Sequence, residues 1–200
     1  MIVDIRGTHG SGKSWLIHQL LDRYEHEPRY NRKITKSKKP KLVGYVLPDI
    51  DTYILGPYKN VCGGCDQLGS PDFICDQLRD AATTYTNVVL EGILVSHAYK
   101  RWIEMSKELK DHEYLFAFLN TPLKKCIARV KGRRLAAGNH KPLNPDSLIK
   151  DHNQIWVRVQ AQMRAANRNV TVLKWQDPLT PVVNLLEGRD TVENLSGAGI

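Results

Sequence analysis

The stretch Gly7-Thr8-His9-Gly10-Ser11-Gly12-Lys13-Ser14 matches the phosphate-loop pattern G-x-x-x-x-G-K-[ST] at every position. The apolar segment Ile2–Ile5 before it is typical of a buried strand, and Ser14–His26 after it repeats apolar residues at helical spacing. This order brings backbone N–H groups and a helix N-terminus onto polyphosphate oxygens. The sequence therefore predicts a nucleoside triphosphate bound by residues 7–14, with Lys13 reaching the β- and γ-phosphates and the Ser14 hydroxyl ligating Mg²⁺.

The composition limits the class of protein. Of the 200 residues, 42% are hydrophobic and 25% are charged, which excludes a disordered or fibrous chain. The 29 lysines and arginines outnumber the 21 acidic residues, and the net charge of +8 favours a polyanionic partner or a heavily phosphorylated substrate. No apolar run approaches the roughly 20 residues of a membrane span, and no secretory signal is visible. We expect a soluble cytoplasmic protein with no membrane partner.

Strand-length apolar segments alternate with longer helical patterns, which predicts an α/β fold with a parallel sheet. The further predicted strands are Leu42–Leu47, Val88–Leu90, Tyr114–Leu119 and Val170–Leu173. The further predicted helices are Asp72–Tyr85, Tyr99–Leu109, Thr121–Ala137, Asp146–Ala166 and Leu179–Leu186. We expect one P-loop NTPase domain over residues 1–188, with five parallel strands and helices on both faces of the sheet. An irregular loop is expected over residues 49–71 and a flexible tail over residues 189–200.

Three carboxylates follow predicted strands. Glu91 comes directly after Val88–Leu90, and Asp49 and Asp51 follow Leu42–Leu47. Open α/β sheets bind ligands at the carboxyl ends of their strands, so we expect all three carboxylates at the site. Glu91 would hold Mg²⁺ or orient an acceptor hydroxyl, while Asp49 would take the hydroxyl proton, with Asp51 as an alternate base or Mg²⁺ partner. The alternatives are a capping or surface role for Glu91 and a turn-forming role for each aspartate.

Three arginines lie on and at the end of the helix predicted after the fourth strand. Arg129 and Arg133 are four residues apart and share a helix face, and Arg134 follows them. We expect a lid over about residues 129–145, in which Arg129 and Arg133 offset transition-state charge and Arg134 binds the nucleotide. Closure of this lid would exclude water from the reaction. The alternative is a solvated basic helix end.

Two other segments carry unusual composition. Residues 29–41, RYNRKITKSKKPK, contain seven lysines or arginines and no acid, which indicates either a phosphate-backbone contact with Tyr30 stacking on a base or a solvated loop. The segment Cys62-Gly63-Gly64-Cys65 has no second cysteine pair at zinc spacing, so a tight turn shaping an acceptor pocket is favoured and metal binding stays open. His9 occupies a variable position of the phosphate loop, which favours a tolerated side chain over a catalyst.

Together with the phosphate loop, four segments resemble a known family: YILGPYKNVCGGCD, LEGILVSH, FLNTPLKKCIARVKGRR and KPLNPDSL. Over roughly residues 1–175 the chain is similar to the phage-encoded P-loop kinases that include the 5-hydroxymethyluracil DNA kinases. The resemblance implies ATP and Mg²⁺ as cofactors. It also implies a strand order of 2-3-1-4-5, in which the five predicted strands are numbered along the chain from Ile2–Ile5. It also implies phosphorylation of the hydroxymethyl group of 5-hydroxymethyluracil in phage DNA, a step in DNA hypermodification, in the cytoplasm of an infected cell.

The implied substrate is a base inside DNA, which a kinase pocket reaches only after the nucleotide is flipped or unstacked. We expect Tyr53, Tyr58 or Trp102 to receive that base, and Asp66 to contact the substrate. Three alternatives remain open at this point. They are a small-molecule nucleoside or nucleotide kinase, a polynucleotide 5′-end kinase, and a non-catalytic ATP-dependent switch or nucleic-acid-binding module.

Overall fold

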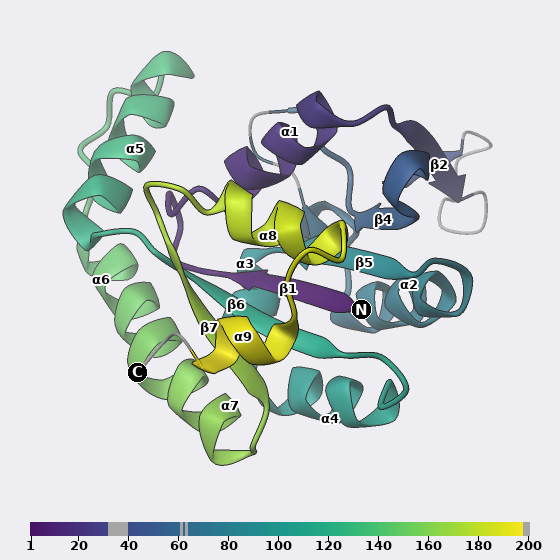
Figure 1. Ribbon diagram of the computed structural model, residues 1–200. Coiled ribbons are helices and arrows are strands. Elements are labelled where there is room, and N and C mark those ends of the chain that lie inside the picture. Colours follow the sequence, from purple (N-terminus) through teal and green to yellow (C-terminus); the bar gives the residue numbers. More distant parts are fainter. Residues whose placement is uncertain (32–39, 61, 63, 198–200) are drawn as a thin grey trace.

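Residues 1–31, 40–60, 62 and 64–197 are described by the computed structural model shown in Figure 1. Within these residues, seven strands form one sheet in the order β2-β3-β4-β5-β1-β6-β7. The strands are β1 Ile2–Arg6, β2 Glu27–Asn31, β3 Lys41–Leu47, β4 Thr52–Leu55, β5 Asn87–Glu91, β6 Tyr114–Asn120 and β7 Asn169–Lys174. The expected α/β class is confirmed, but the expected five-stranded sheet is wrong.

The sheet is mixed rather than all-parallel. Strands β4, β5, β1, β6 and β7 run parallel to one another, whereas β3 pairs antiparallel with both β2 and β4. The strand that ends in Glu91 lies beside the strand that leads into the phosphate loop, as expected, but the expected pairing of Leu42–Leu47 with the Glu91 strand is wrong, because β4 lies between them. The central strands β1 and β5 are buried at every residue, because helices cover both faces of the sheet.

Strand β4 was missed in the sequence, where residues 49–71 were expected to form an irregular loop. A 3₁₀ turn, Pro48–Ile50, reverses the chain after β3, and Thr52–Leu55 then inserts between β3 and β5. The reversal makes β3 antiparallel, so its carboxyl end lies at the amino ends of the parallel strands. Its amino end, at Lys41, lies toward the edge that carries the phosphate loop.

Helices pack on both faces of the sheet (Figure 1). One face carries α1 Lys13–Arg23, α8 Leu179–Leu186 and α9 Val192–Gly197. The other carries α2 Pro71–Thr84, α3 Ile93–His97, α4 Lys100–Glu108 and α7 Gln160–Ala165. The helices α5 Leu123–Ala136 and α6 Asp146–Asn153 lie beside each other beyond the sheet edge, and a π-helical segment, Gln154–Val159, joins α6 to α7. The predicted helix Asp146–Ala166 is therefore present with an altered middle.

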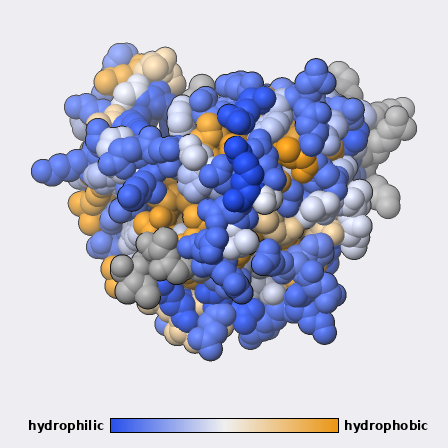
Figure 2. All heavy atoms as spheres, viewed as in Figure 1, coloured by the Kyte–Doolittle hydropathy of each residue, from blue (hydrophilic) through white to orange (hydrophobic). Residues whose placement is uncertain are grey.

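Within the described residues 189–197, part of the expected flexible tail is helical and packs against the sheet. Residues 189–200 were expected to form a flexible tail, but α9 packs against β7, with Val192 buried and the Thr171 hydroxyl donating to the Leu195 carbonyl. Hydrophilic residues cover most of the face drawn in Figure 2. Among the described residues, no helix has the length and apolar character needed to cross a bilayer.

Candidate active site

The phosphate loop links the end of β1 to the start of α1. Gly12 has a φ of 108°, a left-handed conformation that favours glycine and lets the loop turn into the helix. The buried Lys13 ammonium donates to the carbonyl oxygens of Gly7 at 2.7 Å and Thr8 at 3.3 Å. Burial lowers the pKa of Lys13, while the nearby Glu91 and Asp66 carboxylates act in the opposite direction. The loop therefore holds an ammonium group ready for an anion.

Glu91 lies across from the start of α1, at the end of β5. The Ser14 hydroxyl donates to Glu91 Oε1 at 2.9 Å, and the carboxylate is almost fully buried. Burial raises the pKa of Glu91 to about 7, although the Lys13 ammonium and the Ser14 hydrogen bond favour ionisation. Gly64 has a φ of +89°, and a Cβ at this residue would collide with the Glu91 carboxylate. The close approach of the Gly64 backbone thus completes the burial of Glu91.

The Ser14–Glu91 pair suits a magnesium ion. Mg²⁺ binds oxygen ligands, and it usually takes one or two from protein and the rest from phosphate and water. A hydroxyl and a carboxylate oxygen 2.9 Å apart, beside the phosphate loop, supply such a donor set. The two residues expected to hold Mg²⁺ are therefore adjacent and chemically fit for it.

The expectation that Asp49 and Asp51 face the site is wrong. Both follow β3, whose antiparallel direction places its end at the opposite edge of the sheet from the phosphate loop. The Asp51 carboxylate accepts hydrogen bonds from the backbone N–H and the hydroxyl of Thr86, which lowers its pKa. Asp49 lies in the 3₁₀ turn beside it. Both aspartates therefore serve the turn after β3, which is the alternative role that the sequence left open for them.

Two of the three predicted arginines reach the site. Arg129 Nη1 donates to the Ser11 carbonyl at 3.1 Å, and Arg133 Nη1 lies 2.7 Å from Cys62 Sγ. Both line the cleft. Arg134 points elsewhere, because its guanidinium bonds Asn139 Oδ1 and the Lys141 carbonyl in the segment after α5. The expected contact of Arg134 with the nucleotide is therefore not supported by this arrangement.

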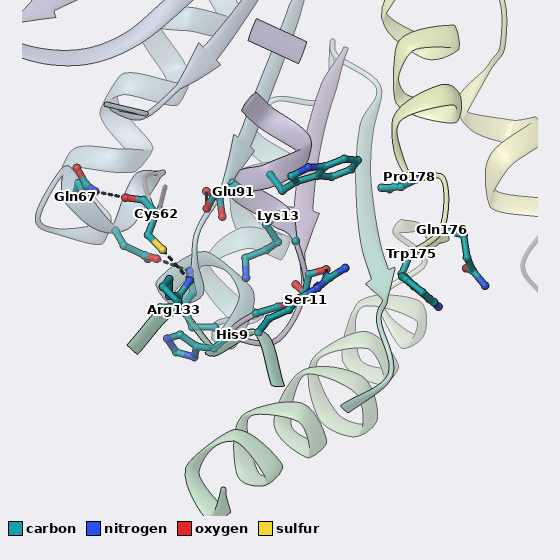
Figure 3. Close-up of a pocket in the computed structure, with 17 residues that line it drawn as sticks. His9, Ser11, Lys13, Cys62, Gln67, Glu91, Arg133, Trp175, Gln176 and Pro178 are labelled. Atoms are coloured by element: carbon teal, nitrogen blue, oxygen red, sulfur yellow. Dashed lines mark hydrogen bonds between the residues drawn. The ribbon is translucent and has the colours of Figure 1, made fainter. Parts of the chain in front are cut away.

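A cleft of about 630 Å³ runs over residues 9–14 of the phosphate loop and has two chemically different ends. One end is formed by Trp175, Gln176 and Pro178, which follow β7. The other is lined by Cys62, Asp66 and Gln67. Figure 3 shows Cys62 and Gln67 on one side of Lys13 and Ser11, and Trp175, Gln176 and Pro178 on the other, with Arg133 on the Cys62 side. The arrangement leaves room for two substrates that meet over the phosphate loop.

The predicted substrate residues differ in their placement. Tyr53 is buried in β4 and stacks on Tyr85, with ring centroids 5.2 Å apart. Tyr58 and Trp102 are also buried, so none of these three rings is free to receive a base. Asp66 does line the cleft, but its two carboxylate oxygens accept the backbone N–H groups of Ile93 and Leu94. Asp66 thereby caps α3. Because Tyr53, Tyr58 and Trp102 are buried, the expectation that one of these rings receives the base is wrong.

The cysteine segment forms one wall of the cleft. The Gln67 side-chain amide donates to the Cys62 carbonyl at 2.7 Å, and the buried Cys65 thiol donates to the Leu55 carbonyl at 3.6 Å. In the part of the chain that the structure describes, no group of three or more His, Cys, Asp or Glu side chains is arranged to hold a metal ion. The arrangement agrees with a turn that shapes the pocket.

No protein-family model matches the chain. A 5-hmdU DNA kinase of Pseudomonas phage PaMx11 is 36% identical to it over 149 residues, which cover 72% of this chain and 75% of that protein. The chain belongs to the 5-hmdU DNA kinase family. A second 5-hmdU DNA kinase, of Pseudomonas phage M6, is 28% identical over 194 residues, covering 92% of this chain and 97% of that protein. The resemblance seen in the sequence is confirmed.

A solved deoxyadenosine kinase from M. mycoides with bound dATP aligns over 94% of this chain and 98% of that chain, with a TM-score of 0.42 and 11% identity. A structural likeness this distant carries no argument about the substrate.

Sequence reasoning missed several residues that line the cleft of this 5-hmdU DNA kinase family member. Trp175 and Gln176 directly follow β7, so the rule that ligands bind at the carboxyl ends of strands could have identified them. Trp15 lines the cleft beside Ser14 and is 51% exposed, which is unusual for so large an apolar ring. No sequence pattern signalled Gln67 or Ile93, because the fold brings them to the cleft.

Proposed function

We propose that the chain transfers the γ-phosphoryl group of ATP to the hydroxymethyl group of 5-hydroxymethyluracil in phage DNA. The observation that carries this proposal is the membership of the 5-hmdU DNA kinase family, at 36% identity to the PaMx11 protein. The two-ended cleft over the phosphate loop supports it, because phosphoryl transfer between two substrates requires both to meet at one site.

The nucleoside of ATP is assigned to the Trp175 end of the cleft. Trp175 offers an aromatic surface there, and its ring is flanked by the Lys125 ammonium at 4.4 Å and the Arg129 guanidinium at 5.9 Å. The triphosphate then extends along residues 9–14, where Lys13 and the N-terminus of α1 supply positive charge. The γ-phosphoryl group is thereby directed toward the end lined by Cys62, Asp66 and Gln67.

Charge stabilisation is the main contribution of the protein to phosphoryl transfer. Lys13, Arg129 and Arg133 place three cationic groups along the cleft. Mg²⁺, held by Ser14 and Glu91, would supply further neutralisation of the phosphate charge. Residues 129–145, which include the end of α5 and the segment before α6, remain our proposed lid.

Polymeric DNA explains the basic surplus better than a free nucleoside does. Most of the basic run over residues 29–41 lies outside the described residues, but its last residue, Lys41, is described. The Lys41 ammonium donates to the Gln67 carbonyl at 2.7 Å, and Gln67 lines the acceptor end of the cleft. Positive charge at this end suits a DNA backbone that must pass the cleft while one base enters it.

The test is to incubate the protein with labelled ATP and matched DNAs that contain thymine or 5-hydroxymethyluracil, beside the free nucleosides. We expect label only in the modified DNA, and a steep loss of labelling as salt increases, because DNA binding releases counterions. Lys13→Ala should abolish labelling, whereas the matched variant Lys110→Ala, at an exposed residue between α4 and β6, should retain it. Label on the free nucleoside with little dependence on salt would support a small-molecule kinase instead.

A further inference from the structure

A carboxylate and an imidazole form a close pair beside the phosphate loop. His9 Nδ1 lies 2.7 Å from Asp151 Oδ2, within hydrogen-bond distance. The His9 side chain is 46% exposed and lines the cleft, whereas the Asp151 side chain is 19% exposed and lies in α6. Figure 3 shows the imidazole on the side of the cleft that carries Cys62 and Arg133, away from Trp175. The pair therefore belongs to the end assigned to the acceptor.

Neighbouring contacts fix the orientation of this pair. Asp151 Oδ1 lies 3.1 Å from His97 Nε2 of α3, so one carboxylate faces two imidazoles. The next residue, His152, has its Nδ1 3.1 Å from the Thr8 hydroxyl, which holds α6 against the phosphate loop. With Nδ1 of His9 engaged by Asp151, Nε2 is the nitrogen left to meet a ligand. Among the residues described here, His9 Nε2 has no hydrogen-bond partner.

The carboxylates of the region are already engaged. Glu91 accepts a hydrogen bond from Ser14, and both oxygens of Asp66 accept backbone N–H groups of α3. Asp51 lies at the opposite edge of the sheet. Within the described part of the cleft, His9 is thus the titratable side chain that combines exposure, an unengaged proton-accepting atom and an orienting partner.

We propose that His9 is the general base of the phosphoryl transfer and that Asp151 is its positioning residue, an inference that rests on the proposed function. The hydroxymethyl O–H gives its proton to His9 Nε2 as the oxygen bonds to the γ-phosphorus. The bond between that phosphorus and the β,γ-bridging oxygen breaks, and its electron pair leaves with ADP. The imidazolium then releases its proton to water, which restores the neutral ring.

The charges around His9 fit this cycle. Asp151 from α6 stabilises the imidazolium that forms, in the manner of a carboxylate that orients a catalytic histidine. The other charged or titratable groups on this side of the cleft are His97 from α3, His152 from α6, Lys13 at the start of α1, Arg133 from α5, Glu91 at the end of β5, and Cys62 and Asp66 from the segment before α2.

The test uses single-turnover transfer from saturating ATP to DNA containing 5-hydroxymethyluracil, over a range of pH. We expect the wild-type rate to rise with pH as a general base loses its proton, and His9→Asn to abolish that rise and lower the rate by about 10²- to 10⁴-fold, far more than it weakens ATP binding. Asp151→Asn should lower the single-turnover rate at saturating ATP and DNA while the dissociation constant for ATP changes little, because the imidazole loses its orienting partner. Added imidazole should partly restore the rate of His9→Ala. His112→Asn, before β6 at the far end of the sheet, serves as the matched control.

The outcomes separate this inference from the proposed function. If the wild-type protein transfers nothing to the modified DNA, the proposed function fails. If the wild type is active and His9→Asn keeps its rate and pH profile, the assignment of His9 as base is overturned. A loss of rate that is matched by an equal loss of ATP affinity, without rescue by imidazole, would also overturn it, because His9 would then be a phosphate ligand.

Discussion

Replacement of Trp175 by alanine tests which end of the cleft receives the nucleoside of ATP. The indole is half-buried, directly follows β7, and lies within cation–π distance of Lys125 and Arg129. Stacking of a base on an aromatic side chain contributes about 1–3 kcal/mol, as judged from alanine substitutions in other proteins. Since about 1.4 kcal/mol corresponds to a tenfold change in a binding constant, Trp175→Ala should weaken ATP binding by roughly five- to 150-fold.

The assay is equilibrium titration of the protein with ATP, paired with the KM for DNA measured at saturating ATP. Trp175→Phe keeps an aromatic face and should lose much less affinity than Trp175→Ala. The KM for DNA should stay within about twofold in both variants, because the acceptor is assigned to the opposite end of the cleft. An unchanged ATP affinity in Trp175→Ala, or a weakened DNA interaction with intact ATP binding, would refute the assigned orientation of the two substrates.

Three further changes test other parts of the structure. Asp4→Ala removes the partner of the fully buried Arg6, 2.7 Å away, and should cost about 3–5 kcal/mol in urea unfolding; a neutral result would contradict the role of this pair. Asp51→Asn should leave the transfer rate unchanged and lower the free energy of unfolding by only about 0.5–1.5 kcal/mol, because it weakens the hydrogen bonds with Thr86. A large loss of rate would show that Asp51 takes part in the reaction. Burial raises the Glu91 pKa to about 7, so the folded metal-free protein binds this proton more tightly than the unfolded chain and loses stability as pH rises from about 4.5 to about 7. Glu91→Gln should remove that pH dependence, and at pH values above 7 the metal-free variant should melt at a higher temperature than the metal-free wild type. Its transfer activity should fall. An unaltered pH dependence of stability would show that Glu91 is not the source of that dependence.

The sequence predicted those parts of the fold that depend on local pattern. The phosphate loop, the strand ending in Glu91 and the amphipathic α1 were all identified, because apolar spacing and glycine positions determine them. Strand β4 is only four residues long, and β2 is mostly exposed and polar, so neither carries a periodic signal. The direction of β3 depends on its partners in the sheet, which no local pattern specifies.

The candidate site was predicted in the same uneven way. The sequence correctly placed Glu91 beside Lys13 and Ser14. The strand before the phosphate loop and the strand that ends in Glu91 are parallel, so their carboxyl ends lie at the same edge of the sheet. Asp49 was misplaced for the same reason, since the rule fails for a strand that runs the other way. Arg134 differs from Arg133 by one helical position, and its contact with Asn139 arises only from the folded segment after α5. Tertiary packing likewise decides that Tyr53 is buried.

The central claim is that the cleft over the phosphate loop phosphorylates the hydroxymethyl group of a base within DNA. The most direct measurement uses a duplex with one 5-hydroxymethyluracil and blocked 5′ ends, treated with ATP, Mg²⁺ and the protein, then digested to nucleosides and analysed by mass spectrometry. The account predicts a phosphate ester on the hydroxymethyl group of that one nucleoside, and none with Lys13→Ala or with the matched thymine duplex. An unmodified nucleoside beside ATP converted to ADP and free phosphate would contradict it.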